Sequence, residues 1–306
     1  MTGLIVNADD FGYTTGINKA VTELYAARAL TSTTLMAGGG AVEDALQRLS
    51  LPRPEHSGAH PALGVGCHIV LVDGTPLSPP EEIRSLLADS PQAAAAAPRF
   101  RSSLAAFVTD LVRGRILEAH IEQEAMAQIR SIQRRGLRLT HLDTHKHTHL
   151  FPRVLRPLLR AALQCGIRAV RNPFEPAWSV QATVRAAAHT PLLRRAQVRA
   201  LSRLQPAFLR LVAEAGVATT AGTLGVLATG TLDAVTLQAL LVAAQAASAP
   251  GAVWELVCHP GYHDQALEAQ PTRLQATREV ERQALAAAGR DGLELLHFGD
   301  LARPGL

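Results

Sequence analysis

Four histidines alternate within residues 141–149, beside a single aspartate, Asp143. Side chains of an extended strand alternate between two faces, so all four imidazoles would share one face. Neutral imidazole is the commonest metal ligand, and neighbouring polar side chains orient the ring that binds the ion. A basic surface strand would give the same spacing, but the apolar exit at residues 150–152 favours burial. The segment therefore predicts a metal site with its supporting side chains.

Two adjacent carboxylates, Asp9 and Asp10, follow the apolar run at residues 4–6. Successive side chains of a strand point in different directions, so one carboxylate can hold a metal ion while the other moves a proton. The pair would also suit the start of a helix near Thr14 or Thr15, where it would only cap backbone N–H groups. On this motif alone, both interpretations stay open.

Two further histidines, His68 and His259, each follow a short apolar run, and Arg171 follows another. Either histidine alone would more often be a packed, hydrogen-bonded side chain. Since both stand after predicted strands, as the carboxylate pair does, we interpret them as members of one site. A site of one aspartate and two histidines is intermediate between hard and soft ligand sets. It suits zinc, manganese, cobalt or nickel and admits magnesium.

These residues need a fold that brings the ends of separate strands together. Seven apolar runs predict buried strands at residues 4–6, 31–36, 63–67, 137–142, 167–170, 252–258 and 293–298. Helical periodicity indicates helices between them at residues 17–29, 116–135, 154–165, 234–247 and 271–288. This alternation predicts a parallel sheet covered by helices. Because five runs end in ionisable groups, we expect their carboxyl ends to meet in a closed or nearly closed barrel.

Length and composition fit one well-buried domain. The chain has 306 residues, of which 47% are hydrophobic and 18% charged. A net charge of +4 spread along the chain does not indicate nucleic-acid binding. Three cysteines without a CxxC pair predict neither a disulfide framework nor a thiolate metal site. Without a signal-peptide or membrane-span pattern, we expect a cytoplasmic protein without a transmembrane segment.

Two segments interrupt the alternation of strands and helices. Residues 76–110, with several prolines and an alanine tract at residues 93–97, predict a loop or lid. Residues 181–213 carry six arginines and no acidic residue. We interpret them as a basic helical insertion whose arginine stems lie on apolar surface, in preference to a peripheral membrane contact. Residues 1–306 are then one domain with two insertions.

Five blocks of sequence resemble the YdjC-like carbohydrate deacetylase family, in the family's order and over most of the chain. They are NADDFG at residues 7–12, LTSTTLM at 30–36, GCHIVLVDGTPLSPP at 66–80, THLDTHKHTHLFP at 140–152 and ELVCHPGY at 255–262. The resemblance implies an α/β fold, an irregular (β/α) barrel with parallel strands similar to a TIM barrel. The family includes chitooligosaccharide deacetylases and a subgroup associated with hopanoid biosynthesis.

Carried over by position, the resemblance assigns roles to the residues singled out above. Asp10, His68 and His145 would hold one divalent ion, with magnesium and zinc as the leading candidates. Asp9 would be the catalytic base and His259 the general acid. The remaining polar side chains at the strand ends would bind substrate or support the ligands; they are Asp143, His147 and Arg171.

The predicted reaction is hydrolysis of an N-acetyl group from an N-acetylglucosamine-containing sugar or glycolipid. Amide hydrolysis needs an activated water, a stabilised oxyanion and a protonated leaving amine, and the predicted residues supply all three. The rivals are a metal-dependent phosphoesterase or amidohydrolase on the same barrel, and a catalytically silent sugar- or lipid-binding protein. The block at residues 68–83 and the basic insertion resemble the hopanoid-associated subgroup, so we expect a lipid-linked sugar, and a homodimer is usual for the family.

Overall fold

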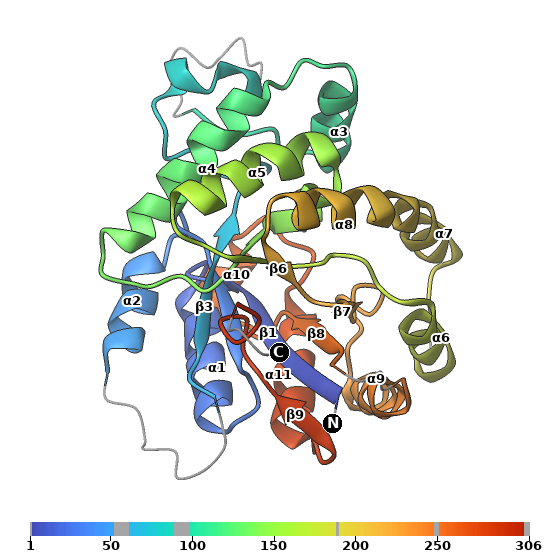
Figure 1. Ribbon diagram of the computed structural model, residues 1–306. Coiled ribbons are helices and arrows are strands. Elements are labelled where there is room, and N and C mark those ends of the chain that lie inside the picture. Colours follow the sequence, from blue (N-terminus) through green and yellow to red (C-terminus); the bar gives the residue numbers. More distant parts are fainter. Residues whose placement is uncertain (1, 52–60, 89–97, 188–189, 248–250, 303–306) are drawn as a thin grey trace.

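A parallel sheet curls through the centre of the computed structural model, which describes residues 2–51, 61–88, 98–187, 190–247 and 251–302 (Figure 1). The strand order is β6-β5-β4-β3-β2-β1-β8-β7, and β9 pairs with β1 outside this path. Every pairing between these strands is parallel. The strands are β1 (Thr2–Phe11), β2 (Ser32–Leu35), β3 (Gly64–Ile69), β4 (Leu142–Thr144), β5 (Ala169–Val170), β6 (Ala218–Thr219), β7 (Gly222–Leu224), β8 (Val253–Cys258) and β9 (Leu293–Leu295).

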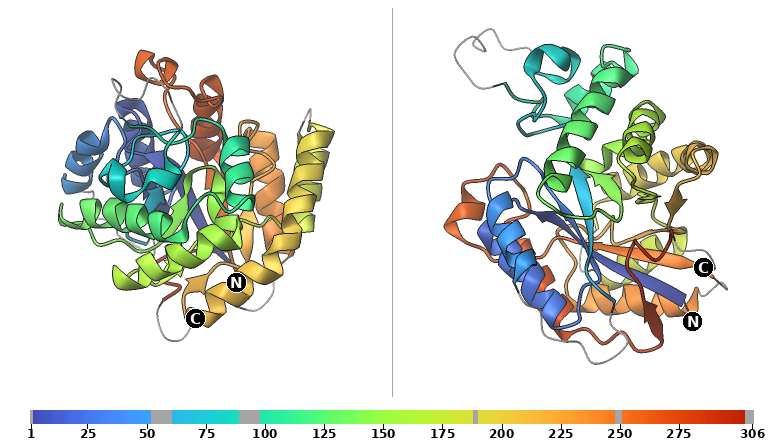
Figure 2. Two further views of the ribbon diagram at one scale, coloured as in Figure 1. Left: turned by 90° about the horizontal axis from the view of Figure 1, so that it is seen from above. Right: turned by 60° about the vertical axis from the view of Figure 1, so that its left-hand side comes forward.

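Helices surround the sheet (Figure 2). They pack side by side in two series, α2-α1-α11-α9-α6 and α4-α5-α8. Within the described ranges, the end strands β6 and β7 are not paired with each other, so the barrel stays open between them. The predicted irregular (β/α) barrel is confirmed. The α-helices are α1 (Thr15–Ala26), α2 (Val42–Ser50), α3 (Leu104–Val112), α4 (Glu118–Gln133), α5 (Pro152–Gln164), α6 (Ala177–Ala186), α7 (Leu192–Leu201), α8 (Gln205–Glu214), α9 (Ala234–Ala246), α10 (Gln265–Glu268) and α11 (Ala276–Ala287).

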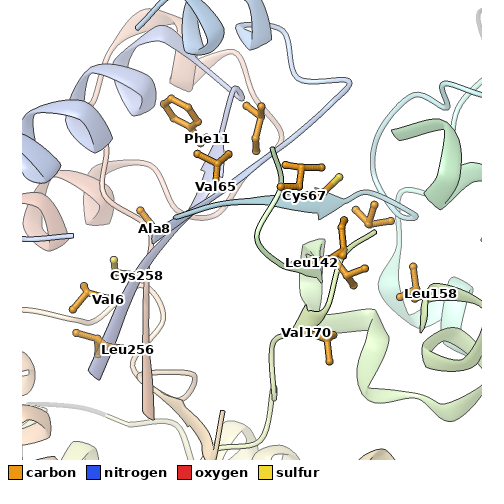
Figure 3. Close-up of a cluster of buried hydrophobic side chains, with 14 of the residues drawn as sticks. Val6, Ala8, Phe11, Val65, Cys67, Leu142, Leu158, Val170, Leu256 and Cys258 are labelled. Carbon is orange, nitrogen blue, oxygen red and sulfur yellow. The ribbon is translucent and has the colours of Figure 1, made fainter. Parts of the chain in front are cut away.

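The central strand β1 is buried along its whole length, between β2 and β8. Val6 and Ala8 pack in the hydrophobic core with Leu256 and Cys258 of β8 (Figure 3). A strand buried on both faces is typical of parallel sheets covered by helices. The apolar packing fixes the position of β1, and it thereby fixes the carboxylates at the end of this strand.

The five predicted helices correspond to α1, α4, α5, α9 and α11, with ends shifted by a few residues. Thr14 caps α1, because its side chain accepts a hydrogen bond from Ile17 N. The strand prediction at residues 137–142 was displaced, since β4 begins only at Leu142. Strands β6 and β7 were missed because runs of two or three residues give no readable periodicity.

The histidine segment is not a strand, and this prediction was wrong. After β4 ends at Thr144, the chain forms the 3-10 segment η3 (His145–Leu150), in which Lys146 and His147 have φ values of 58° and 51°. Residues in this left-handed region break the alternation of an extended chain. The four imidazoles therefore do not share one face.

Both interrupting segments contain ordered structure. Residues 76–110 include the short helices η1 (Pro80–Glu82) and η2 (Arg84–Leu86) and the start of α3, while residues 89–97, with the alanine tract, lie outside the described residues. Ile83 and Phe107 of this segment are fully buried, so the segment packs on the body at these residues. In residues 181–213, the described part of the chain contains the end of α6, all of α7, η4 (Ser202–Leu204) and most of α8, while residues 188–189 lie outside the described residues. No described helix is long and apolar enough to span a membrane.

Candidate active site

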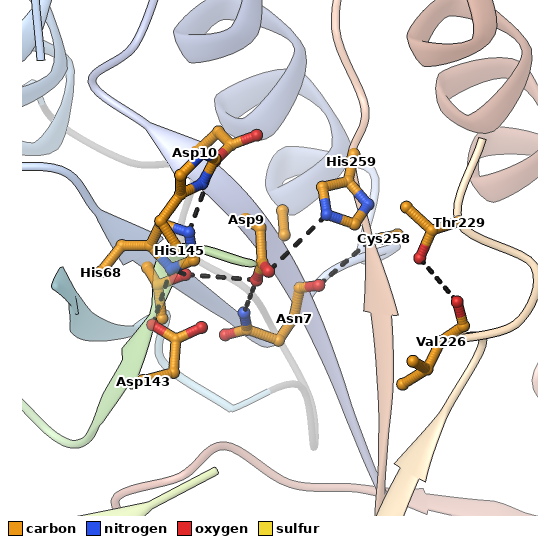
Figure 4. A network of polar contacts seen from close by, with 12 residues as sticks. Asn7, Asp9, Asp10, His68, Asp143, His145, Val226, Thr229, Cys258 and His259 are labelled. Atoms are coloured by element: carbon orange, nitrogen blue, oxygen red, sulfur yellow. Dashed lines mark hydrogen bonds and ion pairs between the residues drawn. The ribbon is translucent and has the colours of Figure 1, made fainter. Parts of the chain in front are cut away.

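Two consecutive carboxylates end β1 and point to different parts of the site (Figure 4). The register of β1 against β2 shifts between Ala8 and Phe11, and Asp10 has a φ of 66°. Aspartate adopts this left-handed conformation more readily than most residues. The irregularity turns Asp10 toward His68, near the end of β3, and toward His145, which follows β4. Asp9 instead faces His259, which follows β8.

Asp10, His68 and His145 form a compact group at the carboxyl ends of β1, β3 and β4. Asp10 Oδ1 lies 3.4 Å from His68 Nε2 and 3.4 Å from His145 Nδ1. The three atoms all lie within 4.8 Å of one another. Oδ1 is buried and accepts no hydrogen bond from the described part of the chain. A carboxylate oxygen without a donor, facing two imidazole nitrogens, fits a divalent cation.

A second group, Asp9, His68 and Asp143, is also close enough to hold an ion. Its carboxylates already have a cationic partner, because Arg171 Nη2 donates to Asp9 Oδ1 at 2.6 Å and Nη1 donates to both Asp9 Oδ2 and Asp143 Oδ2. The guanidinium is fully buried. Of the two groups, the one that contains Asp10 is therefore the better fit for a divalent ion.

His68 is oriented by Asp143, as an imidazole that binds a metal usually is. Asp143 Oδ1 lies 2.7 Å from His68 Nδ1, and Thr34 Oγ1 lies 3.2 Å from the same nitrogen. These contacts leave His68 Nε2 facing Asp10. Burial alone would lower the pKa of His68, but the carboxylates of Asp143, Asp10 and Asp9 raise it to about 10.

Asp9 is held in a fixed orientation by three donors. Besides the two-pronged contact from Arg171, it accepts from Asn7 Nδ2 at 2.9 Å and from Thr34 Oγ1 at 3.2 Å. Burial opposes ionisation, yet the Arg171 guanidinium holds the pKa of Asp9 well below its usual range. Arg171 is itself fixed by Glu255, whose Oε1 accepts from Nε at 2.8 Å. Glu255 lies in the fifth sequence block, but no role was predicted for it.

His259 lies on the other side of Asp9. Its Nε2 is 3.7 Å from Asp9 Oδ2 (Figure 4). Its Nδ1 is 3.9 Å from Glu281 Oε2. Burial lowers the pKa of His259 to about 4, against the opposite effect of Asp9 and Asp10. The imidazole is therefore neutral at neutral pH and can take up a proton.

Two side chains of α11, Arg278 and Glu281, form hydrogen bonds with residues of the site, and neither was predicted from the sequence. Arg278 Nη2 donates to Asp10 Oδ2 at 2.5 Å, and Glu281 Oε2 accepts from His259 N at 2.6 Å. Both side chains are 1% exposed. Positions three apart share one face of a helix, and that spacing was the only available signal. It is too common among charged helical residues to single out a site.

The other histidines of residues 141–149 have separate surroundings. His141 stacks on Phe298 with 3.8 Å between ring centroids. His149 Nδ1 lies 2.7 Å from Thr144 Oγ1, and its Nε2 lies 3.2 Å from Arg171 O. Burial lowers the pKa of each of these two histidines well below its usual range, which suits neutral packed rings. His147 is half-buried, and its Nδ1 has no hydrogen-bond partner in the described residues.

Fold and site together define a (β/α) barrel protein with an aspartate–histidine group at the carboxyl edge of its sheet. The chain belongs to the YdjC-like protein family, whose sequence profile matches residues 3–289. A solved structure from Enterococcus faecalis V583, named as a candidate cellobiose-phosphate cleavage protein, is similar over 99% of both chains, with a TM-score of 0.72 and 23% identity. That likeness concerns the fold.

Curated relatives are similar over about half of this chain. A carbohydrate deacetylase of Brevibacillus brevis is 35% identical over 171 residues, which cover 56% of this chain and 59% of the relative. A carbohydrate deacetylase of Geobacillus stearothermophilus is 37% identical over 174 residues, or 55% and 60% of the two chains. A chitooligosaccharide deacetylase of Salmonella newport is 36% identical over 166 residues, or 54% and 57%. The matches thus span less than two thirds of these relatives.

Proposed function

We propose that this protein is a metal-dependent hydrolase that removes the N-acetyl group from an N-acetylglucosamine-containing sugar. The observation that carries the proposal is the position of Asp10 Oδ1, 3.4 Å from both His68 and His145, beside the pair of Asp9 and His259. Relatives named as carbohydrate and chitooligosaccharide deacetylases support the same reaction class.

One divalent ion would be held by Asp10, His68 and His145, with magnesium and zinc as the leading candidates. Bound there, it would acidify a water molecule and polarise the acetyl carbonyl. His145 is the most open of the three, since its side chain is 23% exposed whereas those of Asp10 and His68 are 3% and 2% exposed. Substrate would therefore approach from the side of His145.

Asp9 is the proposed base, which accepts a proton from the attacking water. Arg171 holds the pKa of Asp9 well below its usual range, so the proton does not remain on this carboxylate. His259 Nε2 is 3.7 Å from Asp9 Oδ2, so His259 is the proposed acceptor of this proton from Asp9.

His259 is then the proposed general acid. It gives its proton to the sugar nitrogen as the bond between that nitrogen and the acetyl carbon breaks, which leaves acetate and a free amine. Glu281 fixes the backbone at His259 through the bond to its N–H group. Asp143 and Arg171 act as positioning residues for His68 and Asp9, and half-buried His147 is proposed to contact substrate.

A metal-dependent phosphoesterase or amidohydrolase is the rival enzyme. Two-metal phosphoesterases need a second open group of ligands. Among the residues that the structure describes, the second aspartate–histidine group is closed by Arg171, which supports a single ion. A catalytically silent sugar- or lipid-binding protein would not require the pair of Asp9 and His259 beside an ion site.

Acetate release from a panel of N-acetylglucosamine conjugates tests the proposal, with metal content measured on the same sample. Sugar phosphate esters are tested in parallel, with phosphate release as the measurement. We expect acetate from at least one conjugate and no phosphate. Phosphate without acetate would favour the phosphoesterase, and binding of a conjugate without either product would favour the silent binding protein.

The carrier of the sugar is proposed to be a lipid or a saccharide. On α7, Leu192 and Leu193 are 75% and 71% exposed near the exposed Arg195 and Arg199, which suits contact with a lipid surface. The ratio of kcat/KM for an acetylated glucosaminyl lipid to that for diacetylchitobiose decides between the carriers. A cytoplasmic location and a homodimer remain predictions.

A further inference from the structure

The β7–α9 loop, residues 225–233, begins at the carboxyl end of a strand that pairs with β8, and His259 follows β8. Within the loop, Thr229 Oγ1 donates to Val226 O at 3.0 Å (Figure 4). On its other side, β7 pairs with no strand of the described ranges, because the barrel is open between β6 and β7. Other contacts must therefore fix the loop along this open edge.

Glu281 of α11 joins the β7–α9 loop to His259. Its Oε1 accepts from Gly230 N at 3.2 Å, and its Oε2 accepts from His259 N at 2.6 Å. Gly230 has a φ of 80°, a left-handed conformation that glycine adopts without strain. Both oxygens of this buried carboxylate are thus used by backbone N–H groups. A displacement of the loop would therefore reach the backbone at His259.

Arg194 of α7 binds the same loop from the basic insertion. Its Nη1 donates to Thr229 O at 2.7 Å, and its Nη2 donates to Val226 O at 3.3 Å. Two bonds from one planar guanidinium fix orientation as well as distance. Burial lowers the pKa of Arg194, and the nearby carboxylates of Glu175 and Glu281 oppose this effect. The side chain therefore lies between the loop and two buried carboxylates.

Glu175, which follows β5, binds N–H groups of the β7–α9 loop. Its Oε1 accepts from Gly225 N at 3.2 Å, and its Oε2 accepts from Leu227 N at 2.7 Å. Glu175 thus takes N–H groups of the loop, whereas Arg194 takes carbonyl oxygens. Both side chains come from the segment between β5 and β6. They therefore hold the loop across the open edge of the barrel.

Helix α7 has little other connection with the fold. None of its residues is buried, and Leu192 and Leu193 are 75% and 71% exposed. A helix in a folded protein gains most of its stability from burying an apolar face, which α7 does not do. The two bonds of Arg194 are thus its clearest attachment to the body. This indicates that α7 serves the loop and not the hydrophobic core.

We propose that Arg194 is a positioning residue for His259, because it fixes the β7–α9 loop, which acts through Gly230 and Glu281 on the backbone of the general acid. The inference rests on the proposed function and deepens it. The basic insertion then has a role in the reaction that does not depend on contact with a lipid.

The test compares kcat and KM for diacetylchitobiose in wild type, Arg194→Met and Arg194→Lys. Methionine keeps the apolar stem and removes both donors, whereas lysine keeps a charged donor for one carbonyl oxygen. A displaced general acid slows the chemical step without weakening substrate binding. We expect kcat to fall about tenfold or more in Arg194→Met with little change in KM, and to recover partly in Arg194→Lys. Arg203→Met, at an exposed arginine of η4, should keep the wild-type kcat.

A double variant with Glu281→Gln tests the route. The amide nitrogen of glutamine cannot accept a hydrogen bond, so Glu281→Gln breaks one of the two bonds that join the loop to His259. Because Arg194 is proposed to act through Glu281, the double variant should have nearly the kcat of Glu281→Gln alone. A double variant whose loss is the product of the two single losses would overturn this route.

Amide hydrogen exchange at Gly230 and His259, followed by NMR without substrate, gives a readout that needs no turnover. We expect exchange at both amides to be about tenfold faster or more in Arg194→Met, and unchanged in Arg203→Met. If Arg194→Met does not fold, both measurements are made on Arg194→Lys, whose smaller changes should have the same direction.

Unchanged exchange at both amides in a folded Arg194→Met variant would overturn the proposal, as would faster exchange with an unchanged kcat. A wild-type protein that releases no acetate, with faster exchange in Arg194→Met, would contradict the proposed function and leave the contact between the loop and His259 supported.

Discussion

Arg278 on α11 donates to Asp10 on β1 across 268 positions of sequence, with 2.5 Å between Nη2 and Oδ2. The contact occupies one oxygen of this buried carboxylate and leaves the other toward His68 and His145. Arg171, by contrast, donates to both oxygens of Asp9. Each carboxylate of the pair has its own buried arginine, and the two arginines keep the roles of the carboxylates distinct.

Replacing Arg278 with methionine should destabilise the metal-free protein by about 3–5 kcal/mol, because a buried carboxylate loses its charged partner. A divalent ion would then supply the missing positive charge, so added metal should raise the Tm of Arg278→Met more than that of wild type. Arg282→Met, on the same helix but bonded to Glu279, is the matched control. An equal rise in Tm for Arg278→Met and wild type would show that the charge of Arg278 is not coupled to ion binding.

The His68→Ala and His145→Ala variants should each lose most of the bound divalent ion, measured by elemental analysis after dialysis. Each change removes one of three proposed ligands. His120→Ala is the control, since His120 bonds to Ser85 away from the site. Full metal content in both variants would place the ion elsewhere.

Asp9→Asn should lower kcat for deacetylation by about 10²–10⁴-fold while the metal content stays at the wild-type level. The amide has nearly the shape of the carboxylate but cannot accept a proton from water. Single-turnover kinetics and metal analysis on one preparation check both parts. Loss of metal would make Asp9 a ligand, and activity near wild type would remove it from the base role.

Glu281 predicts a pH dependence of stability. Burial raises its pKa to about 7, against the effect of the N–H groups of His259 and Gly230 that it accepts from. The folded carboxyl therefore holds its proton more tightly than the unfolded one. Its contribution to stability is complete below pH 4.5 and is lost as the pH rises through 7.

Glu281→Gln removes this titration. The stability of wild type relative to Glu281→Gln should decrease by roughly 3 kcal/mol between pH 4.5 and pH 8, measured by urea unfolding at each pH. In the control Glu279→Gln the change should have the opposite sign, because Arg282 lowers the pKa of Glu279. A constant difference between wild type and Glu281→Gln would show that Glu281 does not titrate in this range.

The fold could be predicted from the sequence because its long elements have clear periodicity. Strand β1 and helices α1, α4, α5 and α9 lie where apolar patterns indicated them. The site was predictable where residues that can do chemistry lie at the carboxyl ends of such elements, as Asp10 does in β1 and His68 does in β3. Strand alternation failed at residues 145–150, because Lys146 and His147 adopt a left-handed backbone that a local apolar pattern does not indicate.

The supporting residues could not be predicted for a different reason. Arg278 and Glu281 belong to a helix whose charged residues would ordinarily face solvent, and only the three-dimensional structure brings this helix face to the carboxyl end of β1. The bonds of Arg194 to the β7–α9 loop likewise join segments far apart in the chain. Local patterns carry no information on such long-range contacts.

Titration of the metal-stripped protein with a divalent ion, followed by acetate release from diacetylchitobiose, tests the central claim most directly. One ion per chain should restore full activity in the wild type. Asp10→Ala should neither bind the ion nor release acetate. Acetate release from fully stripped protein, or a requirement for two ions per chain, would contradict a single-ion site at Asp10, His68 and His145.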